Sequence, residues 1–335
     1  MESREGPSNL EIPKQDHEIL ADRFKREKLQ YSHGDVLVRD VRPENKRYDE
    51  TVLLSTLGFG TGNVALGRTV TELYYMGEEV VELDFLGGGR GVKGAPGTSS
   101  EYNRQGLLMA EFMEDYFDKN PHIKQMDLML QSAGLNRLNA IVYLRPDLLP
   151  KIRSVIFSSP VGFSKEGGLK GLIKRRNAEE SRYKNGPKGE LDQENAENLM
   201  KAFKSLYLRH PVKAIKEGLG VRRANKYPML EKLQNAGIKV GIWQGDDDLL
   251  AEKSELLERI GEEYESSFTQ GINLYTEETI HIYDPVEKDP PPIDAVRLVA
   301  GGHGIQVDDP KKAAKTIIGL RDYIVRAPNN PIEVE

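Results

Sequence analysis

The chain of 335 residues contains no cysteine, which excludes disulfide bonds, thiolate metal sites and a cysteine nucleophile. It also lacks any apolar run near the ~20 residues that a membrane-spanning helix needs, so we expect no membrane insertion. The first ten residues are polar and contain no apolar signal core, and from this we expect a cytoplasmic protein. A net charge of -6 provides no general attraction for nucleic acid, so no nucleic-acid partner is expected.

Apolar residues make up 38% of the chain and charged residues 30%, a composition typical of a globular protein. Strand-like segments alternate with helical ones, which predicts an α/β fold with a mostly parallel sheet. Residues 163–236 interrupt this alternation with helical stretches only, and residues 1–15 are typical of a loose tail. We therefore expect one core built from residues 16–162 and 237–335, with a helical insertion between the two parts. The strand-like segments are residues 35–39, 51–55, 80–85, 128–130, 154–160, 239–244 and 295–299, and residues 272–283 suggest a hairpin.

One tight passage from strand to helix stands out. The apolar run from Leu128 to Leu130 ends at Ser132, and a helical pattern over residues 135–143 begins at once. A turn this short holds its central residue in strained backbone geometry and presents the side chain at the end of the sheet. That placement suits a nucleophilic serine. Since a serine after a strand is more ordinarily a helix N-cap, the assignment depends on partners elsewhere in the chain.

Two glycine clusters admit another interpretation. Residues 60–65 read Gly-Thr-Gly-Asn-Val-Ala after a strand and before a helix, and Asp84 lies at the end of the next strand. This pattern is typical of a dinucleotide site, in which the acid binds a ribose. The remainder of the chain offers less support, because it contains no Tyr-x-x-x-Lys motif. No Gly-Lys-Ser or Gly-Lys-Thr follows these glycines, which excludes a nucleotide P-loop.

The turn at Ser132 resembles the nucleophile elbow of the α/β-hydrolase fold, with Gly134 as the small residue two positions on. The resemblance extends over residues 20–330 and includes the glycine clusters. It implies a doubly wound, mostly parallel sheet, with residues 163–236 as a helical cap over the site. The sequence departs from the family at Leu130, where glycine is usual. We expect the elbow to accommodate Leu130 by a slightly wider separation of strand and helix, which leaves Ser132 exposed.

The resemblance also implies a catalytic triad, because Ser132, Asp248 and His303 follow three strand-like segments in the order expected for this fold. A serine hydroxyl is a weak nucleophile until an imidazole takes its proton, and a buried carboxylate fixes the tautomer of that imidazole. Asp248 is the preferred acid among three successive aspartates, since the family's acid usually stands three residues after the glycine. The backbone N–H groups of Phe59 and Ala133 are the expected oxyanion donors. Taken alone, each residue also has a non-catalytic explanation: Asp248 could belong to a solvent-exposed turn, and His303 could simply lie in a loop.

The expected function is hydrolysis of a small-molecule ester, thioester or amide through an acyl-enzyme, with no cofactor and no metal. The alternatives are a non-catalytic receptor with the hydrolase fold, which Leu130 motivates, and the dinucleotide oxidoreductase. Residues 161–236 contain 17 Lys and Arg against 9 Asp and Glu, which fits either a solvated face or attraction of an anionic substrate. The remaining histidines lack metal-ligand spacing, and we expect them in surface or packing roles: His17, His33, His122, His210 and His281.

Overall fold

The computed structural model describes residues 25–56, 67–86, 90–160, 174, 177–178, 181, 226–245, 248, 268–273, 278–283, 293–299 and 309–326. The strands are β1 (Glu27–Tyr31), β2 (Gly34–Val41), β3 (Thr51–Thr56), β4 (Val80–Phe85), β5 (Gln125–Gln131), β6 (Ile152–Ser158), β7 (Lys239–Gly245), β8 (Phe268–Asn273), β9 (Glu278–Tyr283) and β10 (Ala295–Val299). The helices are α2 (Gly67–Tyr75), α3 (Ser100–Lys119), α4 (Leu135–Leu144), α8 (Tyr227–Asn235) and α11 (Pro310–Arg326), with 3₁₀ turns at Ser132–Gly134 and Pro146–Lys151.

These strands form one sheet in the order β1-β2-β4-β3-β5-β6-β7-β10-β9-β8. The central strands from β4 to β10 pair in parallel, whereas β1 and β2 on one side and β9 and β8 on the other are antiparallel. The predicted α/β fold with a mostly parallel sheet is confirmed, and so is the suggested hairpin, which is β8 and β9. Because β3, β5, β6, β7 and β10 are parallel, their carboxyl ends meet at one edge, here called the carboxyl edge.

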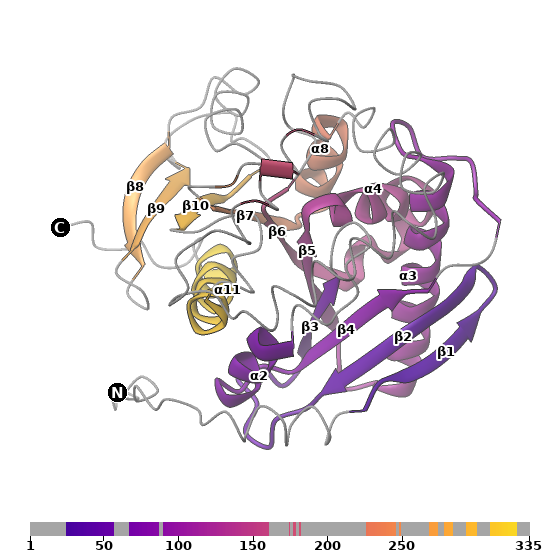
Figure 1. Cartoon of the computed structure of the whole chain (residues 1–335), viewed down its shortest axis with the longest axis horizontal. Helices are drawn as coiled ribbons and strands as arrows, with labels where there is room; N and C mark the ends of the chain where they lie inside the picture. The colour runs from indigo at the N-terminus through magenta and orange to yellow at the C-terminus, as the bar shows by residue number, and fades with distance from the viewer. Residues whose placement is uncertain are drawn as a thin grey trace.

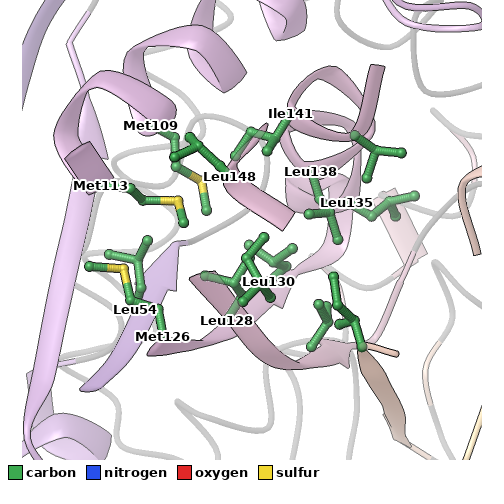
Figure 2. Packing of buried hydrophobic residues seen from close by; sticks show 14 of the residues in the cluster. Leu54, Met109, Met113, Met126, Leu128, Leu130, Leu135, Leu138, Ile141 and Leu148 are labelled. Carbon is green, nitrogen blue, oxygen red and sulfur yellow. The ribbon is translucent and has the colours of Figure 1, made fainter. Parts of the chain in front are cut away.

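Helices cover both faces of the sheet (Figure 1), as the predicted doubly wound arrangement requires. Apolar side chains of α3, α4 and α8 pack on one face, and those of α2 and α11 pack on the other. The strands β3 and β5 are buried on both faces, so they are continuous apolar runs in the sequence rather than alternating patterns. On the first face, Leu128 and Leu130 of β5 lie against Leu135 and Leu138 of α4 (Figure 2).

Helix α8 belongs to the core layer. Met229, Leu230 and Leu233 are fully buried and join the cluster beneath α4. These residues lie inside the range 163–236 that the sequence assigned to the cap, while residues 182–225 lie outside the described part of the chain.

A network of buried charges lies at the opposite edge, where the parallel strands begin. Arg321 of α11 donates to Asp127 of β5, to Glu78 before β4 and, over 3.1 Å, to Thr51 of β3. Arg153 also binds Asp127, at 3.0 and 2.5 Å. The six charged members, here called the amino-edge network, are three cations and three carboxylates: Arg47, Arg153, Arg321, Glu78, Asp127 and Asp322.

An aromatic ring is enclosed in this network. The guanidinium groups of Arg321 and Arg153 lie 4.3 and 4.7 Å from the centroid of the Tyr48 ring, and the Tyr48 hydroxyl donates to Asp322. Burial alone would raise the pKa of Asp127, but Arg321 and Arg153 outweigh that effect and hold the pKa below its usual value. The Asp127 carboxylate is therefore charged at neutral pH.

Candidate active site at the carboxyl edge

The backbone at Ser132 has the strained geometry that the sequence predicted. Its φ is 52°, in the left-handed region that residues other than glycine rarely adopt. Such a conformation costs roughly 1–2 kcal/mol, so the surrounding structure has to hold it in place. The 3₁₀ turn from Ser132 to Gly134 passes directly into α4, and this junction is the sharp strand-to-helix turn expected of a nucleophile elbow.

The turn accommodates Leu130, as expected. The Leu130 side chain is fully buried and packs between the strand and α4 (Figure 2). A Cβ atom placed on Gly134 would lie 3.5 Å from the Leu130 Cβ and 3.4 Å from the Thr56 Oγ1, which is ordinary van der Waals contact. Strand and helix are therefore far enough apart to hold the leucine without a clash.

The expectation that Ser132 would be left exposed is wrong, because only 9% of its surface remains accessible. The whole turn is covered, and Ala133 and Leu135 are at 1% and 0%. The serine therefore lies in a covered site rather than on an open surface.

A second serine, Ser159, also has a positive φ, but the residue after it cannot supply an oxyanion donor. Ser159 follows β6, the strand beside β5, with φ 44°, and it is 1% exposed. Its N–H donates to the Trp243 carbonyl over 2.8 Å. The next residue is Pro160, which has no N–H group, so an oxyanion donor of the kind expected at Ala133 is missing here. Ser132 is followed directly by helix α4, whereas residues 161–173, which come after Ser159 and Pro160, lie outside the described part of the chain.

Asp248 follows β7 and is buried, with 3% of its surface accessible. Its Oδ2 accepts a hydrogen bond from the Gln244 Nε2 at 2.8 Å, and its N–H faces the Gly245 carbonyl at 3.4 Å. A buried carboxylate held in this way suits the orienting role in a triad. Since β7 is parallel to β5 within the same sheet, Asp248 and Ser132 both lie at the carboxyl edge.

The other predicted site residues lie outside the described part of the chain. These are His303 and Phe59, together with the glycine clusters of residues 60–65 and 87–89. The flanking strands are described: β10 runs parallel to β7 and β3 runs parallel to β5, so both end at the carboxyl edge. The roles of His303 and Phe59 therefore stay predictions, as does the dinucleotide alternative.

Arg137, a buried arginine of α4, also lies at the elbow and was not predicted from the sequence. Its Nε donates to the Gln105 Oε1 at 2.8 Å and its Nη1 to the Thr56 Oγ1 at 3.2 Å. Its guanidinium lies 4.5 Å from the centroid of the Phe85 ring. Arg137 thus joins the elbow helix to the ends of β3 and β4, and the end of β3 leads into the segment that carries Phe59.

Lys226 and Asn136 were also missed, and they lie against the elbow. The Lys226 Nζ donates to the Asn136 Oδ1 at 2.5 Å, and the Asn136 Nδ2 donates to the Ala133 carbonyl at 3.1 Å. Ninety residues separate the lysine from the asparagine, so no local sequence pattern predicts the contact. The one sequence feature that could have indicated a role at the elbow is the polar side chain of Asn136, four residues after Ser132.

Among the described residues, no group of three or more His, Asp or Glu side chains is placed to hold a metal ion. No helix in the described ranges combines the length and apolar character needed to cross a bilayer.

No family model matches the chain, and no curated protein matches it. Solved structures do match. A membrane phospholipase A described as a bacterial virulence factor is 15% identical with a TM-score of 0.56, covering 94% of this chain and 93% of its own. A putative aryl esterase from Burkholderia cenocepacia is 13% identical with a TM-score of 0.57, covering 91% and 100%. A lipase-esterase related protein from Clostridium acetobutylicum is 19% identical with a TM-score of 0.54, covering 85% and 99%. At these identities the likeness concerns the fold, and the chain has the α/β-hydrolase fold.

Proposed function

We propose that this protein is a serine hydrolase that cleaves the ester, thioester or amide bond of a small molecule. The observation that carries the proposal is the left-handed backbone of Ser132 at the junction of β5 and α4. Strain of this kind persists only where surrounding contacts maintain it, and it is concentrated at active sites. The structural neighbours named as esterases and lipases support the same class of reaction.

In the proposed reaction, the Ser132 hydroxyl attacks the substrate carbonyl while His303 takes the hydroxyl proton. The N–H groups of Ala133 and Phe59 stabilise the negative oxygen of the tetrahedral intermediate, and losing one such donor typically costs about 3 kcal/mol. His303 then gives its proton to the leaving group, and Asp248 stabilises the imidazolium throughout. Water attacks the resulting acyl-enzyme in the same way and releases the acid.

A second candidate is a hydrolase-fold receptor that binds a small molecule without cleaving it. The 9% exposure of Ser132 favours this candidate, because a covered serine is less accessible to a substrate. Leu130 at the elbow is the sequence feature that also points in this direction.

Covalent labelling with a fluorophosphonate, followed by peptide mass spectrometry, separates the two candidates. The hydrolase should be labelled on Ser132, and Ser132→Ala should abolish the label. Ser159→Ala is the matched control, because it alters the other serine with a positive φ, and it should be labelled at the wild-type rate. Absence of any label on Ser132 would favour the receptor, and a label that is lost only in Ser159→Ala would mean that the nucleophile is misassigned.

A further inference from the structure

Lys226, which immediately precedes α8, is fully covered, with 1% of its surface accessible. Lysine is among the residues least often buried in this way, because removing its charge from water is costly. Lys226 is followed closely in the chain by Met229 and Leu230, which are fully buried in the core. An apolar side chain of similar length would fill the same space without that cost. Packing alone therefore does not explain a lysine here.

The hydrogen bonds of Lys226 lead to the elbow. Its Nζ binds the Asn136 Oδ1 at 2.5 Å, and the amide nitrogen of Asn136 binds the Ala133 carbonyl at 3.1 Å. Asn136 is fully buried, so its amide has no water to bind in place of these partners. The result is a short chain of hydrogen bonds that starts at Lys226. It finishes on the residue whose N–H is the expected oxyanion donor.

The charged side chains of α4 and α8 have other partners or are exposed to solvent. Arg137 of α4 binds Gln105 and Thr56, while Glu231 and Lys232 of α8 are exposed. Burial lowers the pKa of the Lys226 amine to about 7, and no charge of a described residue contributes to that shift. Near pH 7 the amine is thus about half protonated, and in either form it can donate the hydrogen bond to Asn136.

We propose that Lys226 is a positioning residue that acts through Asn136 to hold the turn at Ala133 in the geometry that stabilises the oxyanion. The pair Lys226 and Asn136 is called the elbow clamp below. Its effect on catalysis rests on the proposed hydrolase function, but its effect on the structure of the elbow does not.

The first test is hydrogen–deuterium exchange, which needs no substrate. Lys226→Met keeps the length of the side chain and removes the donor, so peptides covering residues 132–137 should exchange about tenfold faster or more. Lys232→Met is the matched control: Lys232 also connects α8 to α4, with its Nζ 5.1 Å from the centroid of the Tyr143 ring, but it is exposed and lies away from the elbow. This control should leave the exchange of the elbow unchanged.

The second test is kinetic. In Lys226→Met, kcat for an activated ester should fall by roughly 10- to 100-fold with little change in KM, because small displacements of reacting groups have effects of this size. Asn136→Leu should have a similar effect, and the double variant should be no worse than the more damaged single variant, since both remove one connection. If Asn136→Leu does not fold, Lys226→Gln provides the second variant.

The outcomes separate the clamp from the proposed function. Faster exchange at the elbow in Lys226→Met, with no fluorophosphonate label on Ser132 in the wild type, would support the clamp and reject the hydrolase. Normal labelling with wild-type exchange and wild-type kcat in Lys226→Met would reject the clamp and leave the hydrolase intact. An equal change in Lys232→Met would also overturn the proposal, because the effect would then belong to α8 as a whole.

Discussion

The two edges of the sheet differ in the partners of their buried polar groups. At the amino edge, Arg321, Arg153 and Arg47 each meet a carboxylate, and hydroxyl groups of Thr51 and Ser154 complete the network. At the carboxyl edge a serine has a left-handed backbone, and a buried lysine has an amide as its described partner. Buried charges are therefore paired at the amino edge, whereas local rules of backbone geometry and charge burial are broken at the carboxyl edge. Functional sites are the places where such exceptions are expected.

If the amino edge contributes mainly to stability and the carboxyl edge mainly to catalysis, variants at the two edges should behave differently. A variant at the amino edge should change the free energy of unfolding, and a variant at the carboxyl edge should change turnover.

The largest expected effect concerns the triad. Ser132→Ala or His303→Ala should lower turnover of an activated ester by several orders of magnitude while the folded structure survives. Asp248→Asn should lower turnover less than Ser132→Ala does, and Asp246→Asn should leave turnover close to wild type. Near-wild-type turnover in Ser132→Ala would show that the nucleophile is wrongly assigned, and the reverse ranking of the two aspartates would move the acid to Asp246.

The next effect should appear at the amino edge. Arg321→Met leaves Glu78 and Asp127 short of a buried cation, which typically costs about 3–5 kcal/mol of the free energy of unfolding. Urea denaturation measures this loss, and kcat/KM below the unfolding transition should stay close to wild type. Arg145→Met is the matched control, because Arg145 pairs with Glu114 and Asp147 at the surface, where a salt bridge contributes about 0–1 kcal/mol. Equal losses in the two variants would remove the distinction between the edges.

The burial of Lys226 should make the free energy of unfolding depend on pH. Its pKa is about 7 in the folded protein, whereas an unfolded lysine has a pKa of about 10.4. Between these values the unfolded chain binds one more proton, so the free energy of unfolding should rise with pH from about 7 to 10. Lys226→Met should lack this rise, a difference of up to about 4 kcal/mol across the window. Parallel curves for wild type and variant over this range would mean that the lysine is not buried as described.

The smallest expected effect concerns the basic residues of the inserted segment. If they attract an anionic substrate, kcat/KM for a negatively charged ester should fall with added salt more than that for a neutral ester with the same acyl chain. The reason is that screening shortens the field to about 8 Å at physiological ionic strength. The double variant Arg175→Ala and Arg176→Ala should reproduce the effect of salt. Equal salt dependence for both esters would identify these residues as ordinary solvated surface.

Much of the fold could be predicted because its signals are local. Buried strands such as β3 and β5 are short apolar runs, and the abrupt passage from β5 to α4 is enough to predict the strained serine. Strand β1 was missed, since an edge strand with the sequence Glu-Lys-Leu-Gln-Tyr buries too little apolar surface to stand out. Helix α8 was assigned to the cap because its apolar spacing does not say which surface it packs against.

The contacts that distinguish the two edges could not be predicted, since they join residues far apart in the chain. Arg321 and Glu78 are 243 residues apart, and Lys226 and Asn136 are 90 apart. A single sequence shows that such residues are charged or polar, but not that they are buried together. The exposure of Ser132 was misjudged for the same reason, because the residues that cover a turn come from elsewhere in the fold.

The central claim, that the carboxyl edge is a preorganised hydrolase site, is tested most directly by a crystal structure of the fluorophosphonate-treated protein. The account predicts a phosphorus atom bonded to the Ser132 Oγ, with the phosphoryl oxygen about 2.7–3.1 Å from the backbone nitrogens of Ala133 and Phe59. In the same structure, a ring nitrogen of His303 should lie between Ser132 and Asp248. An adduct on another residue, or a phosphoryl oxygen directed away from Ala133, would contradict it.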